Sequence, residues 1–171
     1  MIIPERLTGY SVFRNGTERL GTSNVELPNL EALTDTVSGA GIAGEVDSPT
    51  IGHYGSMRTT LNFRTIDVPM LKLSAPKSQA LDFRGAQQVY DSAASEYRIV
   101  PVRVSIRGIP VTTTMGSFET NSDTGSSIEI ECTYLMVMVD GVKQIEIDKY
   151  NYIAFIDGVD HLAAYRKSLA L

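Results

Sequence analysis

The run GAGIAG, residues 39–44, has the spacing of the glycine fingerprint that binds dinucleotides. That fingerprint works between an apolar strand and a helix, because the pyrophosphate lies on the N-terminus of the helix. Here the preceding segment, EALTDTVS, is too polar for a central parallel strand. The following segment, EVDSPTIGHYG, cannot form a helix. The motif therefore predicts a glycine-tolerant strand or loop, and no nucleotide cofactor.

The titratable residues show no catalytic or metal-binding arrangement. His53 and His161 lie far apart and lack ligand-like spacing to cysteine or carboxylate partners, so we expect no metal site. Glu129 and Glu131 share one face of a predicted strand, but an acid–base pair needs a pocket and separated pKa values. The single cysteine, Cys132, excludes an internal disulfide and behaves as a small core hydrophobe. We expect no enzyme activity and no cofactor.

The whole chain sets broader limits. At 171 residues it is long enough to bury a core, and we expect a single domain spanning residues 1–171. Its net charge of −5 argues against a surface built to grip nucleic acid. The N-terminus, MIIPERLTGY, does not resemble a signal peptide, and no apolar run is long enough for membrane insertion. We expect folding in a reducing cytoplasm.

The elements that would position these residues are mostly strands. Asn15-Gly16 predicts a two-residue turn in a first hairpin, and Asp140-Gly141 predicts the turn of a long hairpin over residues 126–160. Residues 56–66 and 98–107 alternate between apolar and polar side chains, as strands do. Residues 79–92 fit either a strand or a helix.

The remaining segments are predicted as helices and loops. Asp67 is expected to cap a short helix over residues 68–75, and Asp160 a C-terminal helix with Leu162, Tyr165 and Leu169 on one side. Residues 44–56 and the polar stretch at residues 112–127 are predicted as long loops.

A resemblance rests on the two ends of the chain. The segment CTYLMVMVDGVKQIEIDKYNYIAFIDGVDHLAAYRKSLAL resembles the C-terminal end of major tail tube proteins from contractile-tailed bacteriophages, a family found also in phage-like bacteriocins. The shared features, in order, are CTY, a strand, DG, EID, N, DGVD and a terminal helix. VFRNG, VELP and GAGIAG resemble the N-terminal part of the same family. Residues 67–96 match poorly.

The resemblance implies a mainly β fold: a β-sandwich or split barrel with long hairpins and one or two short helices. It also implies a structural subunit of the inner tail tube, with six copies in a ring and rings stacked into a hollow conduit for genome delivery. In that family each subunit donates two long hairpins to a barrel that lines the lumen. Long hairpins have edges that recruit other chains, and neighbouring subunits would cover them.

The partners implied are further copies of the chain, the tail sheath protein, baseplate and tail terminator proteins, and a tape measure protein in the lumen. DNA would pass through without specific binding. The location implied is the tail of a virion, assembled in the bacterial host cytoplasm. Two alternatives remain open: the tube of a contractile bacteriocin or related injection system without DNA, and a monomeric ligand-binding β-barrel.

Two sets of residues are candidates for this function. The polar faces of three alternating strands would line the lumen: Arg58, Thr60, Asn62, Arg103, Ser105, Arg107, Glu129, Glu131 and Thr133. The sequence does not fix the register of this antiparallel pair, in which Arg103 could face Glu131 or Arg107 could face Glu129. We expect the lumen charges largely to neutralise each other. The polar loop would reach the adjacent ring through Glu45, Val46, Asp47, Ser48, Pro49, His53 and Tyr54.

Overall fold

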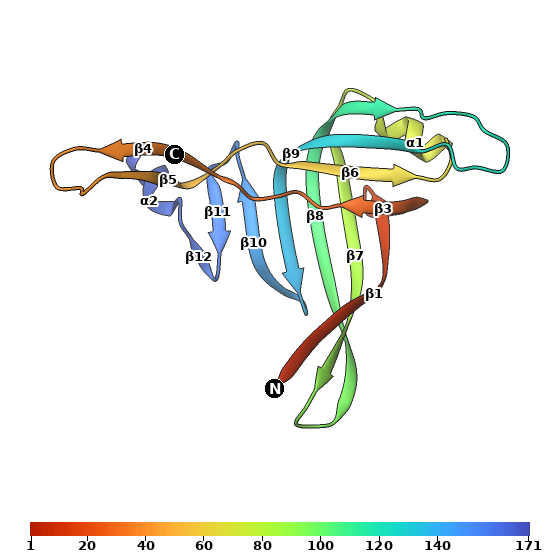
Figure 1. Ribbon diagram of the computed structural model, residues 1–171, viewed down its shortest axis with the longest axis horizontal. Coiled ribbons are helices and arrows are strands. Elements are labelled where there is room, and N and C mark those ends of the chain that lie inside the picture. Colours follow the sequence, from red (N-terminus) through yellow and green to blue (C-terminus); the bar gives the residue numbers. More distant parts are fainter.

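The computed structural model describes residues 1–171 and confirms the prediction of a mainly β chain with two short helices (Figure 1). The elements, in chain order, are β1 (Ile2–Arg14), β2 (Glu18–Leu20), β3 (Thr22–Glu26), β4 (Ala32–Ser38), β5 (Glu45–Tyr54), β6 (Arg58–Phe63), α1 (Val68–Leu73), β7 (Gln79–Asp91), β8 (Glu96–Thr114), β9 (Ser126–Val139), β10 (Val142–Asp148), β11 (Ile153–Ile156), β12 (Val159–Asp160) and α2 (Ala163–Ser168).

Most strands form one antiparallel sheet that curls into a barrel. The hydrogen-bonded path runs β9, β8, β7, β1 and β2, and a second path runs from β9 through β6 to β3. The single residue Gly21 joins β2 to β3, so the two paths meet at a bend of the chain. The barrel is therefore split at this bend, where β2 and β3 follow one another without pairing.

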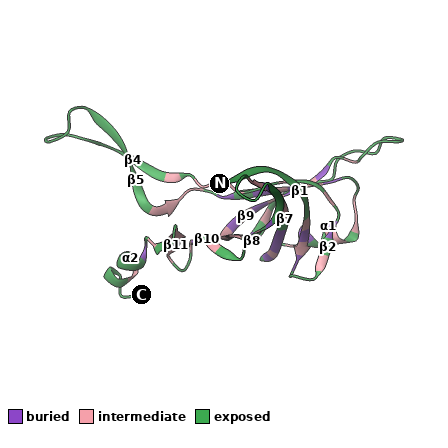
Figure 2. Cartoon of the chain, turned by 90° about the horizontal axis from the view of Figure 1, so that it is seen from below, coloured by how far each residue is buried: buried purple, intermediate pink, exposed green.

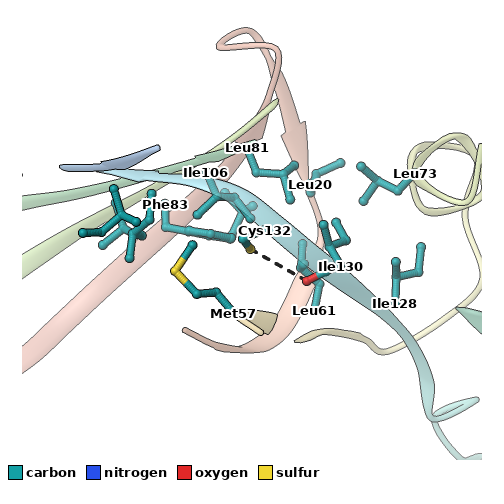
Figure 3. Close-up of a cluster of buried hydrophobic side chains, with 14 of the residues drawn as sticks. Leu20, Met57, Leu61, Leu73, Leu81, Phe83, Ile106, Ile128, Ile130 and Cys132 are labelled. Carbon is teal, nitrogen blue, oxygen red and sulfur yellow. Dashed lines mark hydrogen bonds between the residues drawn. The ribbon is translucent and has the colours of Figure 1, made fainter. Parts of the chain in front are cut away.

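The inside of the barrel is filled by apolar side chains (Figure 3). Along β6 and the first half of β9, every second residue points inward, as the alternation predicts. Leu61 and Ile128 face each other across the β6–β9 pair, and both are fully buried. Such a side chain contributes about 1.5–3 kcal/mol through burial. Met70 and Leu73 of α1 join the same cluster.

A bulge divides β9 into two halves with different neighbours. Residues 126–131 pair with β6, and residues 134–139 pair with β10, while β8 runs along both halves. The register with β8 shifts between Arg107 and Gly108. A Cβ atom at Gly108 would lie 2.2 Å from the backbone oxygen of Glu131, so only glycine fits this crossing. Because of this bulge, the inward-pointing residues of β9 have even numbers up to Cys132 and odd numbers after it, and Leu135 is the next buried side chain.

The hairpins over residues 79–114 and 126–148 are the long ones. Residues 79–92, whose sequence fitted either structure, form strand β7, which pairs with β8 without interruption. At the β9–β10 turn, Asp140 and Gly141 have φ values of 51° and 76°, as the predicted two-residue turn requires. The first hairpin differs from the prediction, because Arg14 pairs with Glu18 and three residues form its loop.

The prediction of a long loop at residues 44–56 is wrong, because strand β5 occupies most of it. β5 pairs with β4, and the two form a separate hairpin, called the arm here, that extends away from the barrel (Figure 1). The GAGIAG run forms the turn of the arm. Glycines and Pro49 favour a loop in the sequence. In the structure, however, β5 pairs only with β4, so its other edge is free, and proline is tolerated there. Most of the arm is exposed on both faces (Figure 2).

The two helices agree only partly with their predictions. Asp67 caps α1 as predicted, since its Oδ1 accepts the backbone N–H of Met70 at 2.7 Å. At the C-terminus, however, Asp160 belongs to β12, and α2 is only the six residues Ala163–Ser168, with Leu162 at the N-cap position and no side-chain cap. Neither helix is long and apolar enough to cross a membrane.

Candidate lumen surface and interfaces

The nine residues predicted to line a lumen all lie outside the barrel core. None of them is buried, which agrees with strands whose apolar faces point inward. The β9 bulge separates them into two groups. The upper group lies around β6 and the first half of β9 and consists of Arg58, Thr60, Asn62, Glu129 and Glu131. The lower group lies on β8 and consists of Arg103, Ser105 and Arg107. Thr133 lies between them, and its hydroxyl donates to the backbone oxygen of Arg107 at 3.3 Å.

Arg58 is the centre of the upper group. Its Nη1 lies 2.5 Å from Oε1 of Glu129, and its Nε lies 3.1 Å from Oε2 of Glu131. The hydrogen bond to Glu129 raises the pKa of Arg58 above its ordinary value. Partial burial raises the pKa of Glu131, but hydrogen bonds from Ser56 and Arg58 outweigh it and hold that pKa below its ordinary value. With Lys149 at 4.0 Å from Glu131, two cations balance two carboxylates.

Asp82 is the centre of the lower group, and the sequence reading missed it. Its Oδ2 lies 2.7 Å from Nη2 of Arg103 and 3.5 Å from Nη2 of Arg84, and its Oδ1 accepts the hydroxyl of Ser105 at 2.5 Å. Asp82 lies directly opposite Ser105 in the β7–β8 pair. Treating residues 79–92 as a strand beside residues 98–107 would have placed Asp82 on this face.

Arg107 has a different environment. Its guanidinium lies over the ring of Tyr134, 4.1 Å from the ring centroid, and it makes no ion pair. Arg84 lies similarly over the ring of Phe13 at 4.6 Å. Arg84 and Arg103 thus share the single carboxylate of Asp82, and Arg107 has no counter-charge, so this region is basic, whereas the upper group is balanced.

Neither of the two arginine–glutamate pairings that the sequence left open between β8 and β9 is present. Arg103 lies opposite Met138 and Arg107 opposite Tyr134, while Glu131 lies opposite Ile109. The register shifts after Arg107 and again between Pro110 and Thr112. These bulges displace the carboxylates along β9, so that they pair with Arg58 on the other side of the strand.

The seven residues predicted to reach an adjacent ring lie on β5. Val46 faces Val37 across the arm, and both are about half exposed, while Asp47 and Thr36 point to the opposite face. Residues 31–56 contain four carboxylates and no lysine or arginine, so the arm is acidic. His53 and Tyr54 lie at the root of the arm and are partly buried. The residues on β5, in full, are Glu45, Val46, Asp47, Ser48, Pro49, His53 and Tyr54.

Two strand edges have no partner within the chain. β1 pairs with β2 only from Val12 onward, so residues 2–11 leave one edge open. On the other side, residues 96–100 of β8 extend past the end of β9, beyond the hydrogen bond from the N–H of Asp140 to the oxygen of Pro101. Exposed apolar side chains accompany both edges, and the largest exposed fractions are 53% at Leu7 and 65% at Tyr97. Open edges of this kind are templates for pairing with another chain.

The histidines, the cysteine and the glutamate pair considered for chemistry in the sequence do not come together into one site. No group of three or more histidine, cysteine, aspartate or glutamate side chains is placed to hold a metal ion. Burial raises the pKa of the Cys132 thiol to about 12. His53 and His161 share no ligand cluster, and Glu129 and Glu131 bind one arginine.

The sequence matches a known family along almost its whole length. The model of phage tail tube protein FII matches residues 4–169. The chain belongs to this family. It is 31% identical over 176 residues to the tail tube protein of Escherichia phage P2, and the match covers 100% of both proteins.

A solved structure shares the tail tube fold. The sheath/tube terminator of PVC, an extracellular contractile injection system in its extended state, superposes with a TM-score of 0.53 at 16% identity. The superposition covers 79% of this chain and 96% of that one. The predicted tail tube fold and the predicted family are thus confirmed.

Proposed function

We propose that this protein is a structural subunit of the inner tube of a contractile tail. Six copies close into a ring, and rings stack into a hollow conduit. The observation that carries the proposal is the pair of open strand edges, β1 at residues 2–11 and β8 at residues 96–100, in a chain that matches a tail tube protein from end to end. Ring closure pairs such edges and removes the aggregation hazard.

The proposal assigns roles to the surfaces described above. The outward faces of β6, β8 and β9, with the upper and lower groups, line the lumen. The arm reaches the adjacent ring, because an isolated two-stranded hairpin is marginal in water and gains stability from a covering surface. Its exposed valine pair, Val37 and Val46, supplies the apolar contact. The whole of residues 1–171 acts as one tube subunit without catalytic activity.

The implied partners follow from this assembly. The outside of the tube contacts a sheath protein, its ends contact baseplate and terminator proteins, and its lumen holds a tape measure protein and then passes DNA without binding it specifically. The assembled protein resides in the tail of a virion. A ligand-binding barrel is disfavoured, since eighteen core residues, Leu61, Phe63 and Ile106 among them, fill the barrel interior.

Negative-stain electron microscopy of the purified protein, over increasing concentration, tests the proposal. We expect rings with six-fold symmetry that stack into tubes of uniform width. Particles isolated from the host provide the second sample. If only monomers are seen under every condition, and the isolated particles contain no such tube, the proposal is wrong.

A further inference from the structure

The arm contacts the rest of the subunit only at its root. The backbone N–H of Gly55 donates to the backbone oxygen of Glu31 at 2.9 Å. This bond joins the two segments of the chain that connect the arm to the barrel. Lys149 reaches across from the β10–β11 loop and donates to the oxygen of Gly55 at 2.6 Å. Beyond this point the arm is a two-stranded hairpin with exposed faces (Figure 2). The contacts at the root therefore decide the direction in which it extends.

Leu162 packs directly onto the backbone of the arm root. A Cβ atom at Gly52, which has φ of +68°, would lie 2.6 Å from Cγ of Leu162. Leu162 is only 4% exposed and belongs to the barrel core. The core thus extends through Leu162 to Gly52 of β5, where a glycine provides both the backbone conformation and the space.

Two aromatic contacts lie beside this one. The ring of Tyr165 meets the ring of His53 edge to face, with centroids 5.2 Å apart. The ring of Tyr152 lies 5.6 Å from Tyr165 on the other side. Such pairs contribute about 0.5–1.5 kcal/mol beyond burial. The arm root is thus held by residues from β5, from the β10–β11 loop and from the C-terminal segment.

The C-terminal segment is itself fixed by one ion pair. A helix of six residues is unstable alone, so α2 needs tertiary contacts. Nη2 of Arg166 lies 2.6 Å from Oδ2 of Asp160, and its Nη1 donates to the oxygen of Tyr152 at 2.5 Å. Oδ1 of Asp160 accepts the N–H of Leu162 at 3.1 Å. The bond to Arg166 lowers the pKa of Asp160, which keeps this carboxylate ionised at neutral pH.

We infer that Asp160, Leu162 and Arg166 clamp Gly52 and so set the direction of the arm toward a second copy of this chain. The inference rests on the proposed function, in which the arm docks on the adjacent ring. It adds that the C-terminal segment is a positioning element for stacking. An arm held in one direction loses less conformational freedom on docking, and this favours assembly.

The test combines an arm distance with tube assembly. Nitroxide labels at Ala43→Cys and Lys77→Cys report the distance from arm tip to barrel by pulsed electron spin resonance. Gly52→Ala places a methyl group against Leu162. Gly141→Ala is the matched control, because Gly141 also has positive φ but nothing lies within 4 Å of its Cβ position. Arg166→Gln loosens the clamp without touching the arm, and it serves if Gly52→Ala fails to fold.

We expect narrow distance distributions for the parent and for Gly141→Ala, and broader ones for Gly52→Ala and Arg166→Gln. We also expect Gly52→Ala and Arg166→Gln to form at least tenfold fewer long tubes than the parent. Equal behaviour of the two alanine variants, or normal tubes despite broadened distances, overturns the inference. If the parent protein forms no tubes at all, the proposed function fails, and the distances alone decide whether the clamp exists.

Discussion

Oδ2 of Asp82 on β7 accepts a hydrogen bond from Nη2 of Arg103 on the neighbouring strand β8, at a distance of 2.7 Å. Ser105 binds the other carboxylate oxygen at 2.5 Å. Partial burial raises the pKa of Asp82, but the hydrogen bonds from Arg103 and Ser105 outweigh it and hold the pKa below its ordinary value. One carboxylate therefore organises the basic face of the β7–β8 hairpin.

Replacing this carboxylate by an amide should destabilise the subunit. Asp82→Asn removes charge-assisted hydrogen bonds and leaves Arg103 and Arg84 without a counter-charge. We expect a loss of about 1–2 kcal/mol, since the arginines are about half exposed. Urea unfolding at pH 7 measures it. Asp123→Asn, on the exposed loop before β9, is the control and should stay within about 0.5 kcal/mol of the parent.

The same carboxylate predicts a pH dependence. Because the folded pKa of Asp82 lies below the ordinary 3.8, the unfolded chain binds more protons in acid. The contribution is complete above about pH 5 and is lost as the pH falls through the folded pKa. The stability difference between the parent and Asp82→Asn should therefore shrink between about pH 5 and pH 2. A difference that stayed constant over this range would contradict the linkage.

The buried thiol predicts low reactivity. Cys132 is fully buried, and burial raises the pKa of its thiol to about 12. Only the thiolate reacts with a disulfide reagent, so native protein should not react at pH 8, whereas urea-unfolded protein should react with one equivalent. Ser122→Cys, at an exposed site, is the accessible control and should react at once. Rapid reaction of Cys132 in folded protein would show that the barrel opens.

The sequence predicted the elements that depend on local pattern. The Asp67 cap, the Asp140-Gly141 turn and the alternating strand at residues 98–107 are where the sequence placed them, because each rests on neighbouring residues. The family resemblance came from the same C-terminal pattern. The outward position of all nine candidate lumen residues also follows from alternation.

Features that depend on distant contacts were missed. The β9 bulge exists because Gly108 on β8 admits the backbone of Glu131, and alternation within one strand cannot show this. The sequence predicts a loop at residues 44–56 because Gly44, Pro49, Gly52 and Gly55 lower strand propensity, whereas pairing with β4 supplies the hydrogen bonds of β5. Asp160 has the residue type of a helix cap, but it binds Arg166 instead.

A charge in the valine pair of the arm, Val37 and Val46, should impair tube assembly without destabilising the subunit. Val46 is 54% exposed in the subunit, so Val46→Asp should change the free energy of unfolding by no more than about 0.5 kcal/mol. In the stacked tube the same charge would be buried without a partner, which costs several kcal/mol, and long tubes should be lost. Thr34→Asp, on the opposite face of the arm, is the control. Electron microscopy and thermal melts measure the two effects, and normal tubes from Val46→Asp would exclude this face from the interface.

The upper group predicts how DNA passes through the tube. Arg58 and Lys149 are balanced by Glu129 and Glu131, so in the proposed tube this part of the wall would present little net charge to the phosphate backbone. Glu129→Gln with Glu131→Gln leaves both cations unbalanced. Each subunit then gains two positive charges, repeated around every ring, and phosphates bind by counterion release. Because exposed ion pairs contribute about 0–1 kcal/mol, the variant should still fold and assemble.

Genome release from particles that carry this double variant should therefore be slow at low salt and near normal at about 0.5 M salt, where screening is strong. The matched control, Glu119→Gln with Asp123→Asn, changes the net charge by the same amount on the exposed loop before β9. Equal slowing by the control would assign the effect to overall charge and not to the wall. Normal release by the Glu129 and Glu131 variant at low salt would contradict the electrostatic argument. A tube structure with Arg58 facing the sheath would remove these residues from the lumen altogether, since a charge outside the tube cannot bind DNA inside it.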